Sequence, residues 1–165
     1  MTQPRNHTLG VHQFAALGVV ICWLLFSAGT GVAQVSMKPE PLVIITSTGE
    51  HTFEVDIAAS RAEQTRGLMF RRSLTPAYGM LFVYPKAQYV SMWMRNTYVS
   101  LDMIFIRADG RVHRIESATE PLSERIIESG ERVSAVLEVV AGAARNIKLK
   151  AGDQVRHSHF NNTSR

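Results

Sequence analysis

The chain has 165 residues, with 18 Lys and Arg against 14 Asp and Glu, and a formal net charge of +4 at pH 7. This length fits a single domain, and a lone cysteine excludes a disulfide within the chain. Charges of both signs are interspersed, without the basic run and interleaved aromatics typical of nucleic-acid binders, so we expect no nucleic-acid partner.

The N-terminal 33 residues have the pattern of a secretory signal peptide. A polar start carries Arg5, residues 14–33 are uncharged, and the segment ends in Gly31-Val32-Ala33. Its strongly apolar part, residues 14–26, is shorter than the roughly 20 residues of a membrane span. We expect cleavage after Ala33, a periplasmic or secreted location, and no membrane span afterwards. A retained membrane anchor is the alternative.

The first part of the mature chain predicts a linker, a hairpin and a helix. Residues 34–41 contain two prolines and indicate a linker. Residues 42–47 and 51–58 predict two strands around a turn at 48–50, and alternation in the second strand predicts one face in water. Ser60 and Glu63 form a Ser-x-x-Glu capping box, which predicts a short helix that ends at Gly67.

The remaining chain is again rich in short strands. We expect strands at 78–84, 89–95, 101–107, 111–117, 133–140 and 154–160, a short helix over 141–149, and a disordered tail at 161–165. Asp109-Gly110 predicts a tight hairpin between two of the strands. The pattern predicts one domain over residues 42–160. We expect a mainly β fold, a compact antiparallel β sandwich or small barrel (jelly-roll-like) with two short helices.

Two acids interrupt strands that are otherwise apolar. Alternation places Asp102 on one face with Ile104 and Ile106, and it places Glu138 on one face with its apolar neighbours two residues away. A buried carboxylate is costly unless it is paired or hydrogen-bonded. The two acids could line a pocket with shifted pKa values, or each could hold a loop by accepting backbone N–H groups or an arginine.

Three further polar residues and a methionine pair are candidates for a site. Asn96 and Thr97 could present hydrogen-bonding groups at a pocket mouth or could simply close a turn. Arg66 could bind a carboxylate or phosphate or could be solvated. Met92 and Met94 share a strand face and could bind Cu(I), or they could fill gaps in the core. We expect no cofactor, and no standard catalytic motif is present.

Four motifs in order make the chain resemble the domain of unknown function 192 family. They are TRGLMFRRSL at 65–74, GMLFVYP at 79–85, MWMRNTYVSLDMIFI at 92–106, and VLEVVAG at 136–142 with KAGDQV at 150–155. The resemblance implies a compact, mainly β, jelly-roll-like domain that is often exported, and it implies no established activity. The polar motif positions that it implies are Arg66, Asn96, Thr97, Asp102 and Glu138.

These observations favour an exported module of the cell envelope. Its polar site would bind a small molecule, a glycan or a protein through Arg66, Asn96, Thr97, Asp102 and Glu138. One alternative is a hydrolase of envelope carbohydrate with Asp102 and Glu138 as acid and base across an open cleft. Another is a copper-binding protein that uses Met92 and Met94.

Overall fold

The computed structural model describes residues 38–163. The predicted signal peptide lies outside these residues, as does most of the predicted linker. No helix within residues 38–163 is long and apolar enough to cross a membrane.

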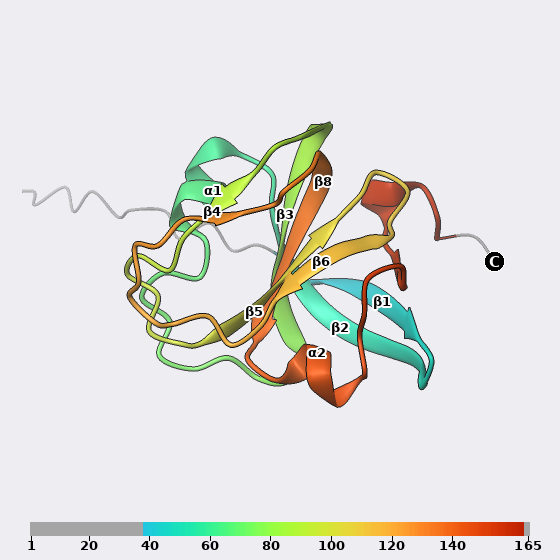
Figure 1. Ribbon diagram of the computed structural model, residues 1–165, viewed down its shortest axis with the longest axis horizontal. Coiled ribbons are helices and arrows are strands. Elements are labelled where there is room, and N and C mark those ends of the chain that lie inside the picture. Colours follow the sequence, from blue (N-terminus) through green and yellow to red (C-terminus); the bar gives the residue numbers. More distant parts are fainter. Residues whose placement is uncertain (1–37, 164–165) are drawn as a thin grey trace, which may run out of the picture. The chain divides into compact units, whose positions relative to one another are not determined.

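Seven strands form one curled sheet in the order β6-β5-β8-β3-β2-β1-β9 (Figure 1). Neighbouring strands are antiparallel except β2 and β3, which are parallel. β4 and β7 pair in a second, smaller sheet. The strands are β1 Glu40–Thr46, β2 Gly49–Ala58, β3 Tyr78–Gln88, β4 Ser91–Met92, β5 Leu101–Ile106, β6 Val112–Glu116, β7 Ile127–Glu128, β8 Val133–Val140 and β9 Gln154–Arg156.

The outer edges of the large sheet approach each other at the start of β6 and β9. Arg111 and Gln154 form an isolated β-bridge, and Val112 N–H donates to the Asp153 carbonyl at 2.9 Å. Val155 N–H in turn donates to the carbonyl of Gly110 at 2.8 Å. The sheet is therefore a curled half-barrel whose edges meet at one point, and the predicted mainly β fold is confirmed.

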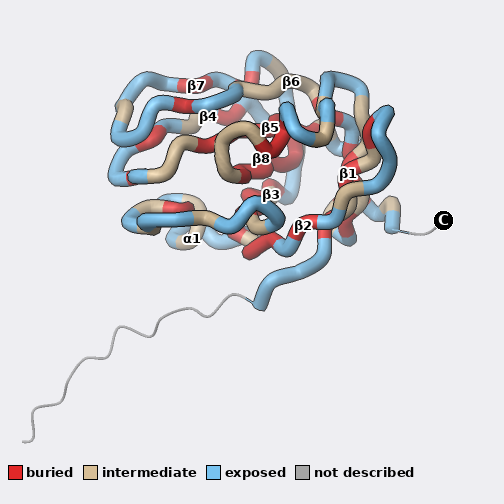
Figure 2. Tube along the Cα trace, turned by 90° about the horizontal axis from the view of Figure 1, so that it is seen from below, coloured by how far each residue is buried: buried red, intermediate tan, exposed pale blue. Residues whose placement is uncertain are grey.

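The large sheet has an apolar core on each face. Figure 2 marks in red the buried residues along β3, β5 and β8. The inner core collects side chains from all seven strands, which curl around it. The outer core lies on the other face, where residues from the loops and from β7 pack on β3, β5 and β8. The inner core includes Leu42, Ile44, Val55, Leu81, Ile104, Leu137 and Val155. The outer core includes Leu68, Met80, Phe82, Met94, Met103, Phe105, Ile127 and Val136.

Several predicted elements differ from the structure in their ends. β3 continues through Pro85 to Gln88, and its pairing with β8 is shifted between Val83 and Gln88, so the proline interrupts no regular ladder. The predicted strand over 89–95 shortens to β4. The second helix, α2, covers only Ala143–Asn146, and β9 gives way to a 3-10 turn at Ser158–Phe160.

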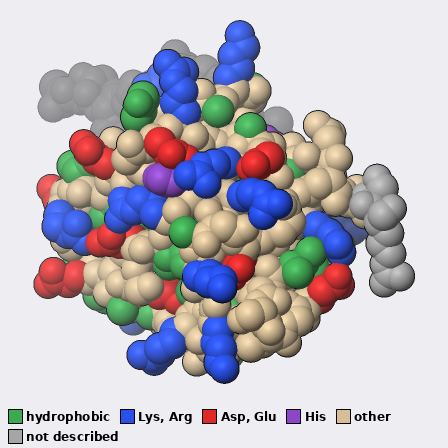
Figure 3. Space-filling view, turned by 45° about the vertical axis from the view of Figure 1, so that its right-hand side comes forward, with side chains coloured by type: hydrophobic (Ala, Val, Ile, Leu, Met, Phe, Trp, Pro, Cys, Tyr) green, Lys and Arg blue, Asp and Glu red, His purple; other side chains and the backbone are tan. Residues whose placement is uncertain are grey.

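Both signs of charge are mixed over the face of the domain in Figure 3. Several charged side chains of the domain form ion pairs: Arg107 contacts Glu131, and Arg156 lies 2.9 Å from Glu50. Pairs of this exposed kind contribute about 0–1 kcal/mol each, so the stability of the domain rests mainly on its two cores.

The capping box of α1 (Arg61–Arg66) is formed as the sequence predicts. Ser60 Oγ accepts from Glu63 N–H, and the Glu63 carboxylate accepts from Ser60 N–H. We expect Ser60→Ala to lower the free energy of unfolding by about 1 kcal/mol, since it leaves a helix N–H without its acceptor. Urea unfolding measures this. Ser73→Ala, at an exposed position outside the helices and strands, is the control and is expected to be neutral. Equal effects of the two substitutions would contradict the role of the cap.

Candidate functional site

Asp102 lies in the middle of the fold and holds the turn around α2. Its side chain is 1% exposed. Oδ2 accepts the N–H groups of Gly142 at 2.9 Å and Ala144 at 3.0 Å, and Oδ1 accepts that of Ala118 at 2.9 Å. Because Ala143 belongs to the inner core, this carboxylate fastens the segment that covers one end of that core. Asp102 therefore has the loop-holding role, and its oxygens are already occupied by protein.

Glu138 is a buried carboxyl with no hydrogen-bond or ion-pair partner in the described part of the chain. It is 4% exposed, and no hydrogen bond or ion pair within residues 38–163 reaches it. Burial raises its pKa to about 8, so the carboxyl is largely protonated at neutral pH. Nearby Tyr84 is also buried, and burial with the charge of Glu138 raises the tyrosine pKa to about 12. Glu138 is thus the strongest electrostatic anomaly among the predicted site residues.

Asp102 and Glu138 lie on opposite faces of the sheet. Asp102 pairs in register with Val139, the neighbour of Glu138, and successive side chains of a strand point to opposite faces. Asp102 faces the side of the inner core, whereas Glu138 shares its face with Met80 and Met103 of the outer core. The hydrolase hypothesis needs two carboxyls across one open cleft. This arrangement contradicts it.

Glu138 is the centre of a row of five side chains that crosses the outer face. Strand register aligns Asp56 with Met80, Met80 with Glu138, Glu138 with Met103, and Met103 with Glu116. We call these five residues the acid–methionine row. Three carboxyls therefore alternate with two thioethers on β2, β3, β8, β5 and β6.

The two outer carboxyls of the row are paired with arginine. Asp56 is 4% exposed and lies 2.7 Å from Arg71, which comes from the loop at 67–77. Glu116 lies 2.5 Å from both Arg114 and Arg125. The sequence predicts that one face of the strand at 51–58 is in water, and Asp56 alternates onto that face. The prediction is wrong for Asp56, because the loop at 67–77 folds back over β2 and buries it. Among residues 38–163, no cation pairs with the central carboxyl of the row.

Asn96, Thr97 and Arg66 lie in or beside the loops that cover the outer core. Thr97 is buried, and its hydroxyl donates to the Arg95 carbonyl at 3.3 Å. Asn96 is exposed, has the positive φ of 56°, and its amide lies 3.9 Å from the Met69 sulfur. Arg66 is exposed at the end of α1. The five predicted residues therefore do not converge in one cleft: Thr97 closes its own turn, and Asp102 is on the other face.

The methionine pair of the copper hypothesis points into the outer core. Met94 is 1% exposed, and its sulfur accepts the Thr119 hydroxyl at 3.1 Å. Met92 packs at the edge of the same core. Within residues 38–163, no three His, Cys, Asp or Glu side chains gather in a way that could hold a metal.

Three loops lie side by side at one end of the domain (Figure 1). They cover residues 67–77, 93–100 and 117–126. Phe70 N–H donates to the Asn96 carbonyl at 2.9 Å, and Leu122 N–H donates to the Thr97 carbonyl at 3.0 Å. The rings of Phe70 and Tyr98 meet edge to face with centroids 6.4 Å apart. These contacts fix the three loops to one another.

The same loops present large apolar side chains to solvent. Phe70 and Leu122 are each 54% exposed, and Tyr98 and Trp93 are 46% and 43% exposed. We call these four residues the loop surface. Phe70 and Leu122 have φ values of 65° and 63°, which bulky residues rarely adopt. A strained backbone that holds apolar side chains in solvent indicates a functional surface. The sequence does not predict this surface, because the strain depends on contacts between loops that are far apart in the chain.

A shallow groove of about 600 Å³ lies beside α2 and the start of the 117–126 loop. Asp102 is one of its lining residues, with Ser117 and the cationic Arg145 and Lys148. The Asp102 oxygens accept three backbone N–H groups and are not free to bind a ligand in the groove. A ligand there would contact the two cationic side chains and the apolar lining residues.

Comparisons with known proteins agree with the fold. The chain is 39% identical to a Sinorhizobium meliloti 1021 protein described as a candidate transcription regulator, with 76% of this chain and 98% of that chain covered and a TM-score of 0.73. It is 35% identical to a protein of unknown function from Novosphingobium aromaticivorans DSM 12444, with 72% and 85% covered and a TM-score of 0.71. No curated protein matches.

The family resemblance of the four sequence motifs is confirmed over most of the domain. The model of the DUF192 family, described as "Uncharacterized ACR", matches residues 43–157, from β1 to just beyond β9. The matched segment includes most of both cores, all five predicted polar positions and the loop surface. The chain belongs to the DUF192 family.

Proposed function

We propose that this chain is an exported binding module of the cell envelope, and that the loop surface is where it binds a protein partner. The observation that carries the proposal is the exposure of Phe70, Tyr98 and Leu122 on loops that are already fixed to one another. Export rests on the signal pattern of residues 1–33.

Rigid, exposed aromatic groups favour a protein partner. Tyr, Trp and Arg are the residues enriched at interface hot spots, and preformed loops lose little conformational entropy on binding. Arg95 already covers the Trp93 ring at 5.0 Å, and Leu122 is aliphatic. This composition suits an apolar protein pocket better than the flat faces of a sugar.

The charge around the loop surface favours an acidic partner. Residues 66–72, 93–98 and 119–126 contain five arginines and two glutamates, a local excess of three positive charges. Arg71, Arg95 and Arg125 are held in ion pairs. Arg66 and Arg72 are exposed, and neither forms an ion pair within residues 38–163. We expect the partner to place carboxylates opposite these two arginines.

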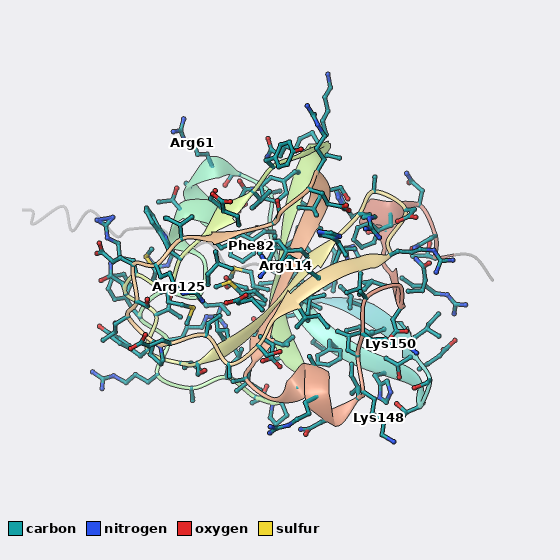
Figure 4. The ribbon with its side chains drawn as sticks, in the orientation of Figure 1. Arg61, Phe82, Arg114, Arg125, Lys148 and Lys150 are labelled. Atoms are coloured by element: carbon teal, nitrogen blue, oxygen red, sulfur yellow. The ribbon has the colours of Figure 1, made fainter. Side chains whose placement is uncertain are left out.

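Site-specific photo-crosslinking in intact cells tests this function. A photoreactive amino acid replaces Tyr98 on the loop surface or, as the matched control, exposed Lys150, which lies away from the loops in Figure 4. We expect one discrete, protease-sensitive adduct from position 98 and none from position 150. The double variant Arg66→Glu/Arg72→Glu is expected to reduce the adduct at least about tenfold, whereas Lys148→Glu/Lys150→Glu leaves it unchanged.

Three results would count against the proposal. Absence of an adduct from position 98 would contradict the proposal that the loop surface binds a partner. An adduct that resists protease and contains lipid or polysaccharide would show that the partner is a membrane or a glycan and not a protein. Equal loss in both double variants shows that net charge matters and that the two arginines beside the loop surface have no particular role.

A further inference from the structure

We propose that Met80, Glu138 and Met103 form a binding site for a soft monovalent cation, Cu(I) in the envelope, at the centre of the acid–methionine row. The site is independent of the loop surface, because it lies beneath the loops and uses none of the residues proposed to contact a protein partner.

The geometry begins with strand register. β8 lies between β3 and β5, so Glu138 has Met80 as its direct neighbour on one side and Met103 on the other. Direct cross-strand neighbours have Cβ atoms about 4.5–5.5 Å apart on the same face. The three flexible side chains leave the sheet together, and both thioethers can turn toward the carboxyl between them.

The second observation is the missing partner of Glu138. Asp56 and Glu116 occupy the two ends of the row, and each is neutralised by arginine. Glu138 is 4% exposed and forms no ion pair or side-chain hydrogen bond within residues 38–163, although its oxygens keep a trace of exposure and are not among the fully buried unpartnered atoms. Buried polar groups in folded proteins normally have a partner, and those without one call for an explanation such as an ion.

Ligand chemistry then selects the class of ion. Thioethers are soft and uncharged ligands that favour Cu(I) over hard ions such as Mg²⁺ and Ca²⁺. Glu138 is largely protonated while the site is empty, and it releases that proton to solvent as the ion binds. One carboxylate with two thioethers then balances a single positive charge, so the buried site is neutral with a monovalent ion. A divalent ion would leave an uncompensated charge in an apolar core, which is costly. Met80 and Met103 are both 0% exposed, which keeps water from competing with the sulfurs.

Titration of the full-length protein with Ag(I) alone, a redox-inert probe for the same ligand class, tests the site. The background is Cys22→Ser, because the Cys22 thiol would bind Ag(I) itself. We expect one tight Ag(I) per chain by calorimetry. Met80→Leu and Met103→Leu each weaken binding at least about tenfold, as does Glu138→Gln, and all three substitutions conserve side-chain volume.

Met94→Leu is the matched control. Met94 is equally buried in the outer core but lies outside the row, and its sulfur is engaged by Thr119. We expect its affinity for Ag(I) to stay within about twofold of the parent, with circular dichroism showing that every variant is folded. Absence of stoichiometric Ag(I) binding by the parent overturns the site. So does an equal loss in Met94→Leu, or a folded Glu138→Gln or Met80→Leu variant that binds as tightly as the parent.

Discussion

Asp102→Ala is expected to lower the free energy of unfolding by about 3–5 kcal/mol, the largest loss from any single substitution considered for this protein. The carboxylate accepts three backbone N–H groups, from Ala118, Gly142 and Ala144. Hydrogen bonds to a charged group contribute about 1.5–3 kcal/mol each, and removal leaves buried donors without acceptors. Urea unfolding followed by circular dichroism measures the loss.

Asp102→Asn keeps the prediction testable if the alanine variant does not fold. The amide retains one acceptor oxygen but turns an NH₂ group toward N–H donors, so we expect a loss of about 2–4 kcal/mol. Asp109→Asn is the matched control. Asp109 also accepts a backbone N–H, that of Arg111 at 3.0 Å, but its side chain is 60% exposed. We expect a change below about 0.5 kcal/mol there. A similarly small change at Asp102 would contradict its loop-holding role.

The pattern within single strands was predictable from the sequence. Alternation placed Asp102 with Ile104 and Ile106 and placed Met103 on the other face, and the structure has this arrangement. The capping box of α1 and the hairpin at Asp109-Gly110 also form as predicted. These features depend on residues a few positions apart, so local chemistry is enough to specify them.

Relations between strands were not predictable in the same way. Alternation gives the face of each acid within its own strand, but only the register of Asp102 with Val139 shows that Asp102 and Glu138 lie on opposite sides of the sheet. Similarly, Asp56 is buried because Arg71 reaches it from a loop 15 residues later. The parallel pairing of β2 with β3 follows from the crossover through α1, which a list of strands does not reveal.

The loop surface could not be predicted from local sequence either. Phe70 and Leu122 carry positive φ values without being glycine or asparagine, so the sequence has no turn signal at either position. Their conformation is imposed by backbone hydrogen bonds to Asn96 and Thr97. Asn96 and Thr97 therefore act here through their backbone carbonyl groups, which position the apolar side chains of Phe70 and Leu122.

Glu138→Gln is expected to change how stability depends on pH. Burial raises the pKa of Glu138 from an ordinary value of 4.5 to about 8. Between these two pH values the folded state binds a proton that the unfolded state has lost, so the free energy of unfolding falls as pH rises and levels off above about pH 8. The full effect of such a shift is about 3–5 kcal/mol. Glutamine cannot ionise, and the variant loses this slope.

Unfolding by urea at about pH 4 and about pH 9 separates this effect from simple repacking. We expect parent and Glu138→Gln to be similarly stable at the acidic pH, where both side chains are neutral, and the variant to be more stable at the basic pH. Glu63→Gln provides a contrast of opposite sign. Hydrogen bonds from Ser60 and Ala59 lower the pKa of Glu63. The charged Glu63 therefore adds to the free energy of unfolding above its ordinary pKa, and this stabilisation is lost on acidification. A difference between parent and Glu138→Gln that is the same at both pH values would show that Glu138 ionises normally in the folded protein. In that case a partner must already stabilise its charge.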